Sequence, residues 1–176
     1  MGRNVEIKAR ASDFTAQRER AAELSGGPSE VLHQEDTFFR SRRGRLKLRK
    51  FSEDSGELIH YERADSEGPS ESRYLIIPTR EPEVLKGALT KGLGAVGTVV
   101  KRREVFLVDG TRIHADEVDG LGRFLELEAV LGPGESREAG ERRVRELAGV
   151  LGISDSDLVD SAYIDLLLER QHGGDS

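Results

Sequence analysis

Hydrophobic and polar residues alternate along most of this chain, which is the pattern of β-strands that bury one face. Residues Asn4–Arg10 read polar, apolar, polar, apolar without interruption. Between Gly44 and Arg49, the basic side chains fall on one face and the leucines on the other. We predict strands in the ranges 4–10, 31–39, 44–49, 57–63, 73–77, 98–108, 111–118 and 124–131.

Apolar residues at helical spacing appear in four further segments. The predicted helices cover residues 12–25, 82–92, 135–151 and 154 to about 168. Ser12 and Ser154 are expected to cap the first and the last of these helices, because a serine hydroxyl accepts a bond from a free helical N–H. Pro82 suits the start of the second helix, and Gly92 is expected to end it.

Short turn sequences separate the predicted strands. Asp109-Gly110 is typical of a two-residue hairpin turn, and other turns are expected at 54–56, 66–69 and 119–122. Because short turns join most neighbouring strands, the sheet should be mostly antiparallel and the class α+β. We expect a single domain over residues 1–170 and a polar, frayed tail over 171–176.

The composition excludes several classes of protein. There is no cysteine, so a disulfide framework, a thiolate metal site and a cysteine nucleophile are excluded. Hydrophobic residues make up 36% of the chain, yet no apolar run is long enough to cross a membrane. The first residues lack an apolar signal segment, so we expect a cytoplasmic protein without a membrane partner.

The charges are unevenly distributed. The formal net charge of −6 argues against a nucleic-acid partner. Basic residues nevertheless cluster between Arg40 and Lys50 and again at 101–103, whereas acidic residues predominate after Asp116. Such clusters are often only solvated faces, and their position on the predicted strands decides between the possibilities.

The strand faces allow two interpretations of these charges. Several strands pair a charged face with an apolar one, as where Glu126 and Glu128 alternate with Leu125 and Leu127. In an ordinary sandwich, the charged faces would lie in water. Alternatively the sheet closes into a barrel, for which eight strands suffice, with its charged faces inward and helices covering its apolar outer face.

A barrel interior of this kind would need a ligand to offset its charges. Arginine and lysine side chains recognise phosphate oxygens, so a polyphosphate would neutralise the basic set. Carboxylates without cysteine suit Mg²⁺ or Mn²⁺, the metals that accompany nucleotide phosphates. Both ligands together form a metal–triphosphate complex.

Several ordered motifs carry a resemblance to a known family. They include Val5-Glu6-Ile7-Lys8, the segment 34–39 and Arg45-Leu46-Lys47-Leu48-Arg49, followed by the segments 101–105, 112–118 and 120–128. These motifs resemble the CYTH family, the superfamily of class IV adenylyl cyclases and thiamine triphosphatases, also called triphosphate tunnel metalloenzymes. The resemblance extends from about Asn4 to Leu168 and implies an eight-stranded antiparallel β-tunnel with helices packed outside.

The resemblance also implies roles for individual residues. Metal ligands are expected at Glu6, Glu126 and Glu128, with Asp116 nearby as a ligand or water-orienting group. Phosphate-binding residues are expected at Lys8, Lys47, Arg49, Arg63, Lys101 and Arg103, with Arg45 as an addition. Independently of the resemblance, His114 shares a strand face with Asp116 and is a further candidate. The expected catalytic residues are Lys8, Asp116, Glu126 and Glu128. Asn4 stands where the family signature Glu-x-Glu-x-Lys has its first Glu, which leaves open whether one metal or two bind.

Two reactions fit such a site. In the favoured one, water attacks the terminal phosphorus of tripolyphosphate, thiamine triphosphate or a nucleoside triphosphate; in the other, ATP is cyclised to cyclic AMP and pyrophosphate. A module that binds triphosphates without turnover is a third possibility. We expect a small-molecule triphosphate as partner and a monomer or homodimer, and we expect Tyr163 to pack against the core rather than line the tunnel mouth.

Overall fold

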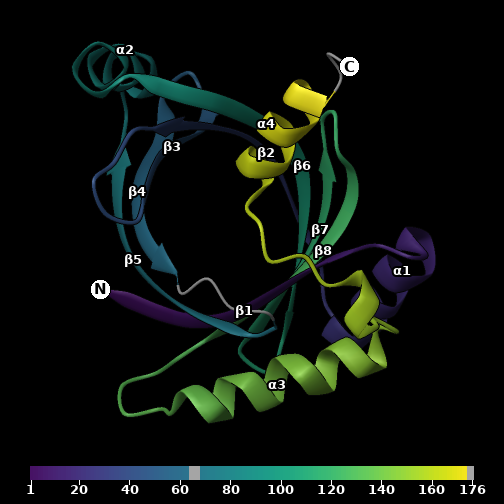
Figure 1. Cartoon of the computed structure of the whole chain (residues 1–176). Coiled ribbons are helices and arrows are strands. Elements are labelled where there is room, and N and C mark those ends of the chain that lie inside the picture. Colours follow the sequence, from purple (N-terminus) through teal and green to yellow (C-terminus); the bar gives the residue numbers. More distant parts are fainter. Residues whose placement is uncertain (64–67, 174–176) are drawn as a thin grey trace.

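The strands form a closed barrel in the computed structural model of the protein, which describes residues 1–63 and 68–173 (Figure 1). Neighbouring strands are antiparallel, in the order β1-β5-β4-β3-β2-β6-β7-β8. Their bounds are β1 Gly2–Arg10, β2 Glu30–Phe39, β3 Arg45–Ser52, β4 Ser55–Arg63, β5 Ser70–Thr79, β6 Ala95–Val108, β7 Thr111–Val118 and β8 Gly122–Val130. The predicted α+β class and eight-stranded barrel are confirmed, and the sandwich interpretation is wrong.

Alternation along the strands separates an apolar outer face from a polar inner face. On β1, Val5 and Ile7 belong to the main apolar core, whereas Glu6 and Lys8 line the interior of the barrel. Leu127 of β8 is fully buried in the same core. The main core therefore lies between the outer surface of the barrel and the helices, which leaves the interior to polar groups.

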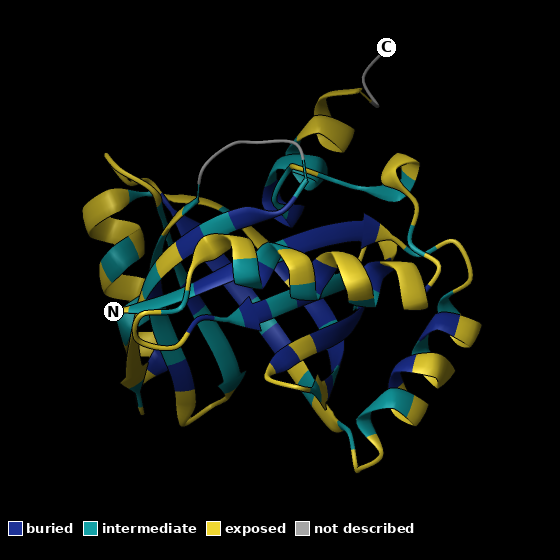
Figure 2. Ribbon diagram, turned by 90° about the horizontal axis from the view of Figure 1, so that it is seen from below, coloured by how far each residue is buried: buried dark blue, intermediate teal, exposed yellow. Residues whose placement is uncertain are grey.

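Figure 1 shows α1, α2 and α3 outside the ring of strands and α4 over its edge, near β2 and β6. Their bounds are α1 Phe14–Ser25, α2 Pro82–Leu93, α3 Arg137–Val150 and α4 Tyr163–Gly173, with a short 3₁₀ helix η1 at Asp155–Asp157. α3 packs against β1 and β8, α1 against β6 to β8, α2 against β2 to β4, and α4 against β6. In Figure 2 the exposed residues of the helices face outward and the buried residues concentrate in the strands behind them. None of the helices in the described part of the chain is long and apolar enough to span a membrane.

The first helix begins one residue later than predicted, because Asp13 is its cap. The Asp13 carboxylate accepts a hydrogen bond from the N–H of Ala16 at 3.1 Å. Ser12 instead accepts a bond from the side chain of Gln17 at 3.4 Å. Ser12 and Asp13 are both good capping residues, so the sequence alone did not distinguish them.

The last helix begins much later than predicted. Ser154 does form a capping box with Asp157, but it caps only η1. Leu158 then forms an isolated bridge with Ala9, and the N–H of Val159 donates to the carbonyl of Lys8 at 2.8 Å. This pairing with the end of β1 holds the chain extended until α4, so tertiary contacts override the local helical pattern.

The turn and tail predictions have mixed outcomes. Asp109-Gly110 forms the expected two-residue turn, with positive φ values of 46° and 73°. The second helix continues to Leu93, and Gly94 rather than Gly92 ends it with a φ of 84°. The predicted frayed tail is helical as far as Gly173. Residues 66–67 of the predicted turn and 174–176 of the predicted tail lie outside the described residues.

Close packing of α3 on β1 gives a test of the fold. A Cβ atom built at Gly140 would lie 2.8 Å from side-chain atoms of Val5 and Leu131, whereas one at Gly149 would meet nothing within 4 Å. We expect Gly140→Ala to lower the free energy of unfolding by about 1–3 kcal/mol through overpacking. Gly149→Ala, in the same helix, should raise it by up to about 1 kcal/mol because alanine is the better helix former. Urea denaturation of both variants tests the packing, and a shift in the same direction for both would contradict it.

Candidate active site

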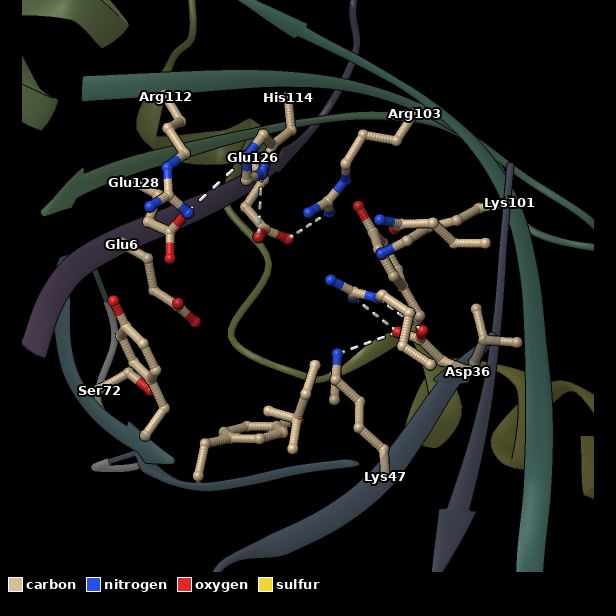
Figure 3. Close-up of a pocket in the computed structure, with 18 of the residues that line it drawn as sticks. Glu6, Asp36, Lys47, Ser72, Lys101, Arg103, Arg112, His114, Glu126 and Glu128 are labelled. Atoms are coloured by element: carbon tan, nitrogen blue, oxygen red, sulfur yellow. Dashed lines mark hydrogen bonds and ion pairs between the residues drawn. The ribbon is translucent and has the colours of Figure 1, made fainter. Parts of the chain in front are cut away.

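A cavity of about 890 Å³ runs through the barrel. Its wall is built from the inward residues of the strands, so charged side chains from distant parts of the chain face one another. Figure 3 shows Glu6 and Glu128 on one side, with Asp36, Lys47 and Lys101 on the other. The cavity is thus divided into a carboxylate side and a cationic side.

The first half of the cationic side is organised by Asp36 of β2. Asp36 is 2% exposed and accepts two hydrogen bonds from Arg49 at 2.8 Å and one from Lys47 at 2.9 Å. Burial alone would raise the pKa of Asp36, but Arg49 and Lys47 outweigh it and hold that pKa well below its usual range. Asp36 therefore stays ionised and fixes Lys47 and Arg49 of β3 at the cavity wall.

Asp116 of β7 does the same for Arg103 of β6. Arg103 donates to the two Asp116 oxygens at 2.7 and 2.6 Å, and the Tyr163 hydroxyl donates to one of them at 2.9 Å. Burial opposes the charge of Asp116, yet Arg103 and Lys101 lower its pKa to about 2. Asp116 is fully buried behind Arg103 and is not among the residues that line the cavity.

The two buried lysines bear on how the cationic side is charged. Burial, together with the charge of neighbouring Arg103, lowers the pKa of Lys101 to about 7 against the opposite pull of Asp116. Burial also lowers the pKa of Lys8. Both ammonium groups lie over the ring of Tyr163, at 4.2 Å for Lys8 and 5.1 Å for Lys101. Burial makes the charged form of both lysines costly, and a bound anionic ligand would offset that cost.

The carboxylate side comes from β1 and β8. In the barrel register Glu6 lies opposite Glu128 and Lys8 opposite Glu126. Arg63 lies 3.3 Å from Glu6, Arg103 lies 3.4 Å from Glu126, and Arg112 donates to Glu128 at 3.2 Å. Each carboxylate therefore has its own cation.

His114 lies between two of these carboxylates. Its Nδ1 atom lies 3.4 Å from Glu126, and its Nε2 atom lies 3.8 Å from Glu128. Burial, reinforced by Arg103, lowers the pKa of His114, so the neutral imidazole is favoured at pH 7. His114 faces the cavity from the carboxylate side, away from Lys47 and Asp36 (Figure 3).

Asn4 occupies the position next to Glu128. Its side chain is 2% exposed and its Nδ2 atom donates to Glu128. Its Oδ1 atom is buried and has no hydrogen-bond partner among the described residues. Asn4 thus holds one carboxylate and presents an unused acceptor at the cavity wall.

The donor chemistry of this side fits a hard divalent cation. Burial, with repulsion from Glu126, raises the pKa of Glu6 to about 7, and a bound cation would favour its ionised form. Within residues 1–63 and 68–173, however, no three carboxylate or imidazole groups lie close enough to hold an ion as they stand. Glu6, Glu126 and Glu128 are paired with arginines instead, so binding an ion would require these side chains to exchange partners.

The structure brings the sequence candidates together in two groups. Those that line the cavity are Glu6, Lys8, Arg45, Lys47, Arg49, Arg63, Lys101, Arg103, His114, Glu126 and Glu128. Arg45 lies at the mouth near α4, where it makes two bonds to Asp165 at 3.0 and 2.6 Å. Asp116 alone lies behind the wall.

Sequence reasoning missed two residues of this network. Asp36 lies on the inward face of β2, and its place among the polar alternating residues was the available signal. Tyr163, expected only to pack, packs edge-on against Phe124 at 5.0 Å and also lines the cavity. Its role depends on the path of residues 158–162, which the helical pattern did not predict.

The end of the cavity far from α4 is lined largely by apolar side chains, unlike the charged centre. Near the turns that follow β3 and β6, apolar side chains line it: Leu32, Phe51, Ile76, Val105 and Leu107. Leu107 is 63% exposed and Ile76 is 47% exposed. The cavity therefore passes from a charged centre to an apolar rim.

Comparison with known proteins agrees with this geometry. The family model for the CYTH domain matches residues 2–163. A protein of Methanocaldococcus jannaschii, provisionally named an adenylate cyclase, is 25% identical over 169 residues, which cover 92% of this chain and 97% of that protein.

Solved structures share the fold. A Pyrococcus horikoshii protein superposes with a TM-score of 0.82 at 23% identity, covering 93% of this chain and 98% of the other. A Hippeastrum protein, provisionally termed an adenylyl cyclase and described as having a dominant triphosphatase activity, superposes with a TM-score of 0.66 at 16% identity, covering 98% and 96%. With the family model matched over nearly its whole length, this chain belongs to the CYTH domain family.

Proposed function

We propose that the protein is a divalent-metal-dependent enzyme that hydrolyses a phosphoanhydride bond of a triphosphate inside the barrel. The observation that carries this proposal is the division of one cavity into a cationic side and a carboxylate side. A polyanion alone would match the first side and a cation alone the second. A metal-bound triphosphate matches both.

The cationic side would bind the phosphate chain. Arg49 and Arg103 present planar guanidinium groups suited to pairs of phosphoryl oxygens, and Lys47 and Lys101 add point charges. Asp36 and Asp116 hold these cations in place before substrate arrives. Such preorganisation spares the reorganisation that a flexible site would need as negative charge shifts in the transition state.

The carboxylate side would hold the metal. Glu6, Glu126 and Glu128 supply the oxygen donors that Mg²⁺ and Mn²⁺ prefer. A bound divalent cation would polarise phosphoryl oxygens and orient the attacking group. The position of Asp116 behind Arg103 favours a role in holding that arginine over direct contact with the metal. Lys8, which lies opposite Glu126 in the barrel register, would contact the phosphate chain.

Hydrolysis and cyclisation remain the two reactions to separate. The triphosphatase activity described for the Hippeastrum protein favours hydrolysis, whereas the name of the Methanocaldococcus protein favours cyclisation. The apolar rim offers room for the organic group of a thiamine or nucleoside triphosphate, and such a group takes part in both reactions. We favour hydrolysis because it needs only the phosphate chain, which the charged centre of the cavity matches, whereas cyclisation also needs the ribose held against the α-phosphorus.

A product assay tests the proposal directly. Tripolyphosphate, thiamine triphosphate and ATP are each incubated with the protein and Mg²⁺ or Mn²⁺, with EDTA as the metal-free control. We expect metal-dependent release of phosphate. Cyclic AMP with pyrophosphate would instead establish the cyclase reaction, and tight tripolyphosphate binding without any product would establish a binding module.

Removal of two carboxylates tests the metal assignment. The double variant Glu126→Gln with Glu128→Gln keeps the size of both side chains and removes their charge. We expect metal-dependent turnover to fall by about a hundredfold or more, because the remaining ligands bind a hard cation weakly. Tripolyphosphate affinity in EDTA should not weaken. Glu141→Gln with Glu146→Gln, on α3, is the matched control, and normal turnover of the first double variant would refute the assignment.

The raised pKa of Glu6 predicts a pH-dependent stability. Its pKa is about 7 in the fold against 4.5 for a glutamate in water, so its contribution to stability is present below about pH 4.5 and lost as the pH rises through 7. We expect Glu6→Gln in EDTA to raise the free energy of unfolding at pH 8, by roughly 2–3 kcal/mol, and to change it little at pH 4. Denaturation curves of variant and wild type at both pH values measure this change. An equal difference in the free energy of unfolding at pH 4 and pH 8 would rule out the raised pKa of Glu6.

A further inference from the structure

Tyr163 is the first residue of α4 and joins the C-terminal part of the chain to the interior of the barrel. It is 6% exposed, lines the cavity and packs edge-on against Phe124 of β8. Its hydroxyl contacts Asp116, the carboxylate that holds Arg103. Its ring contacts the two buried lysines, Lys8 and Lys101.

The hydroxyl acts on Arg103 through Asp116. It donates to Asp116 Oδ2 at 2.9 Å, and the same oxygen accepts a bond from Arg103 at 2.6 Å. Burial, together with the charge of Asp116, raises the pKa of Tyr163 well above its usual value, so the hydroxyl keeps its proton. The phenol therefore fixes the carboxylate that in turn fixes the guanidinium.

The ring acts on both buried lysines. The Lys8 ammonium lies 4.2 Å from the ring centroid and the Lys101 ammonium 5.1 Å from it. Attraction between a cation and an aromatic face strengthens when the cation is removed from water, and these side chains are 7% and 4% exposed. Lys8 also donates to the carbonyl of Ser161 at 3.2 Å, two residues before the tyrosine.

Independent contacts hold this segment on the barrel. Val159 pairs with the backbone of Lys8, and Asp165 both accepts two bonds from Arg45 and accepts one from the N–H of Ala162. Conservative changes at Tyr163 should therefore leave α4 in place. The effect of Tyr163 on the site can then be separated from its effect on folding.

We propose that Tyr163 is a positioning residue that holds three phosphate-binding side chains in place. It holds Arg103 through its hydroxyl, and Lys8 and Lys101 through its ring. The triphosphate part of this inference rests on the proposed function, whereas the ordering of the three side chains does not. The C-terminal segment is then part of the binding site rather than only a cover for the core.

Two substitutions separate the two contributions. Tyr163→Phe removes the hydroxyl and keeps the ring, whereas Tyr163→Leu removes both. Tyr74→Phe, on the carboxylate side of the same cavity, controls for the loss of a phenol hydroxyl. Binding of tripolyphosphate is measured by calorimetry in EDTA, and the melting temperature of each ligand-free variant is recorded.

We expect tripolyphosphate to bind about tenfold more weakly to Tyr163→Phe, the scale of one hydrogen bond to a charged group. Tyr163→Leu should bind about a hundredfold more weakly, because both lysines lose their aromatic partner as well. Tyr74→Phe should bind like the wild type. If the loss of tripolyphosphate affinity is proportional to the fall in melting temperature across all the variants, Tyr163 has a merely structural role and the proposal is overturned.

Spectra of the ligand-free protein provide the readout that is independent of substrate. In ¹⁵N NMR spectra, the Arg103 Nε–H signal should exchange faster with water in both Tyr163 variants. The Lys8 and Lys101 ammonium signals should change only in Tyr163→Leu. Unchanged signals in both variants overturn the proposal. Altered signals in a protein that does not bind tripolyphosphate would support the positioning role and contradict the proposed function instead.

Discussion

The rest of the structure depends on opposite charges that are buried side by side inside the barrel. Arg49 and Arg103 could not lie so close to one another in a partly dehydrated space unless each had a counter-charge of its own. Asp36 and Asp116 supply these charges through paired hydrogen bonds. The two aspartates thus allow the interior to be strongly basic where it faces the cavity while the folded chain remains stable without a ligand.

Closure of the barrel turns the inward polar residues of each strand toward one cavity, which has a carboxylate side and a cationic side. The β1 and β8 strands bring Glu6 opposite Glu128, although more than a hundred residues separate them in sequence. The apolar core is displaced to the outer surface, where α1 and α3 cover it. Departures at single inward positions can therefore alter the site without altering the fold. Asn4 illustrates this, since its side chain donates to Glu128 where a glutamate, as in the family signature it resembles, would add a further carboxylate.

Sequence periodicity predicted the strands and most inward-facing charges, because a period of two residues is set by the backbone and survives any tertiary context. It did not predict which polar side chains would pair across strands, so Asp36 was missed. It also did not predict the path of the C-terminal segment. Ser154 carries a genuine capping signal, but pairing of the next residues with β1 ended the helix and delayed α4 until Tyr163. That competition is decided by contacts between distant segments, which local pattern does not reveal.

The pairing of β1 with β8 has a consequence for how the protein is made. During synthesis β1 leaves the ribosome well before its partner β8, which ends at Val130. Its other partner, β5, is made earlier but pairs only with residues 2–6, so Ile7, Lys8 and the end of β1 stay unpaired until β8 follows. Folding dominated by such distant pairings is slow and leaves unpaired strands open to aggregation. Production of this protein should therefore be sensitive to translation rate and to the supply of chaperones.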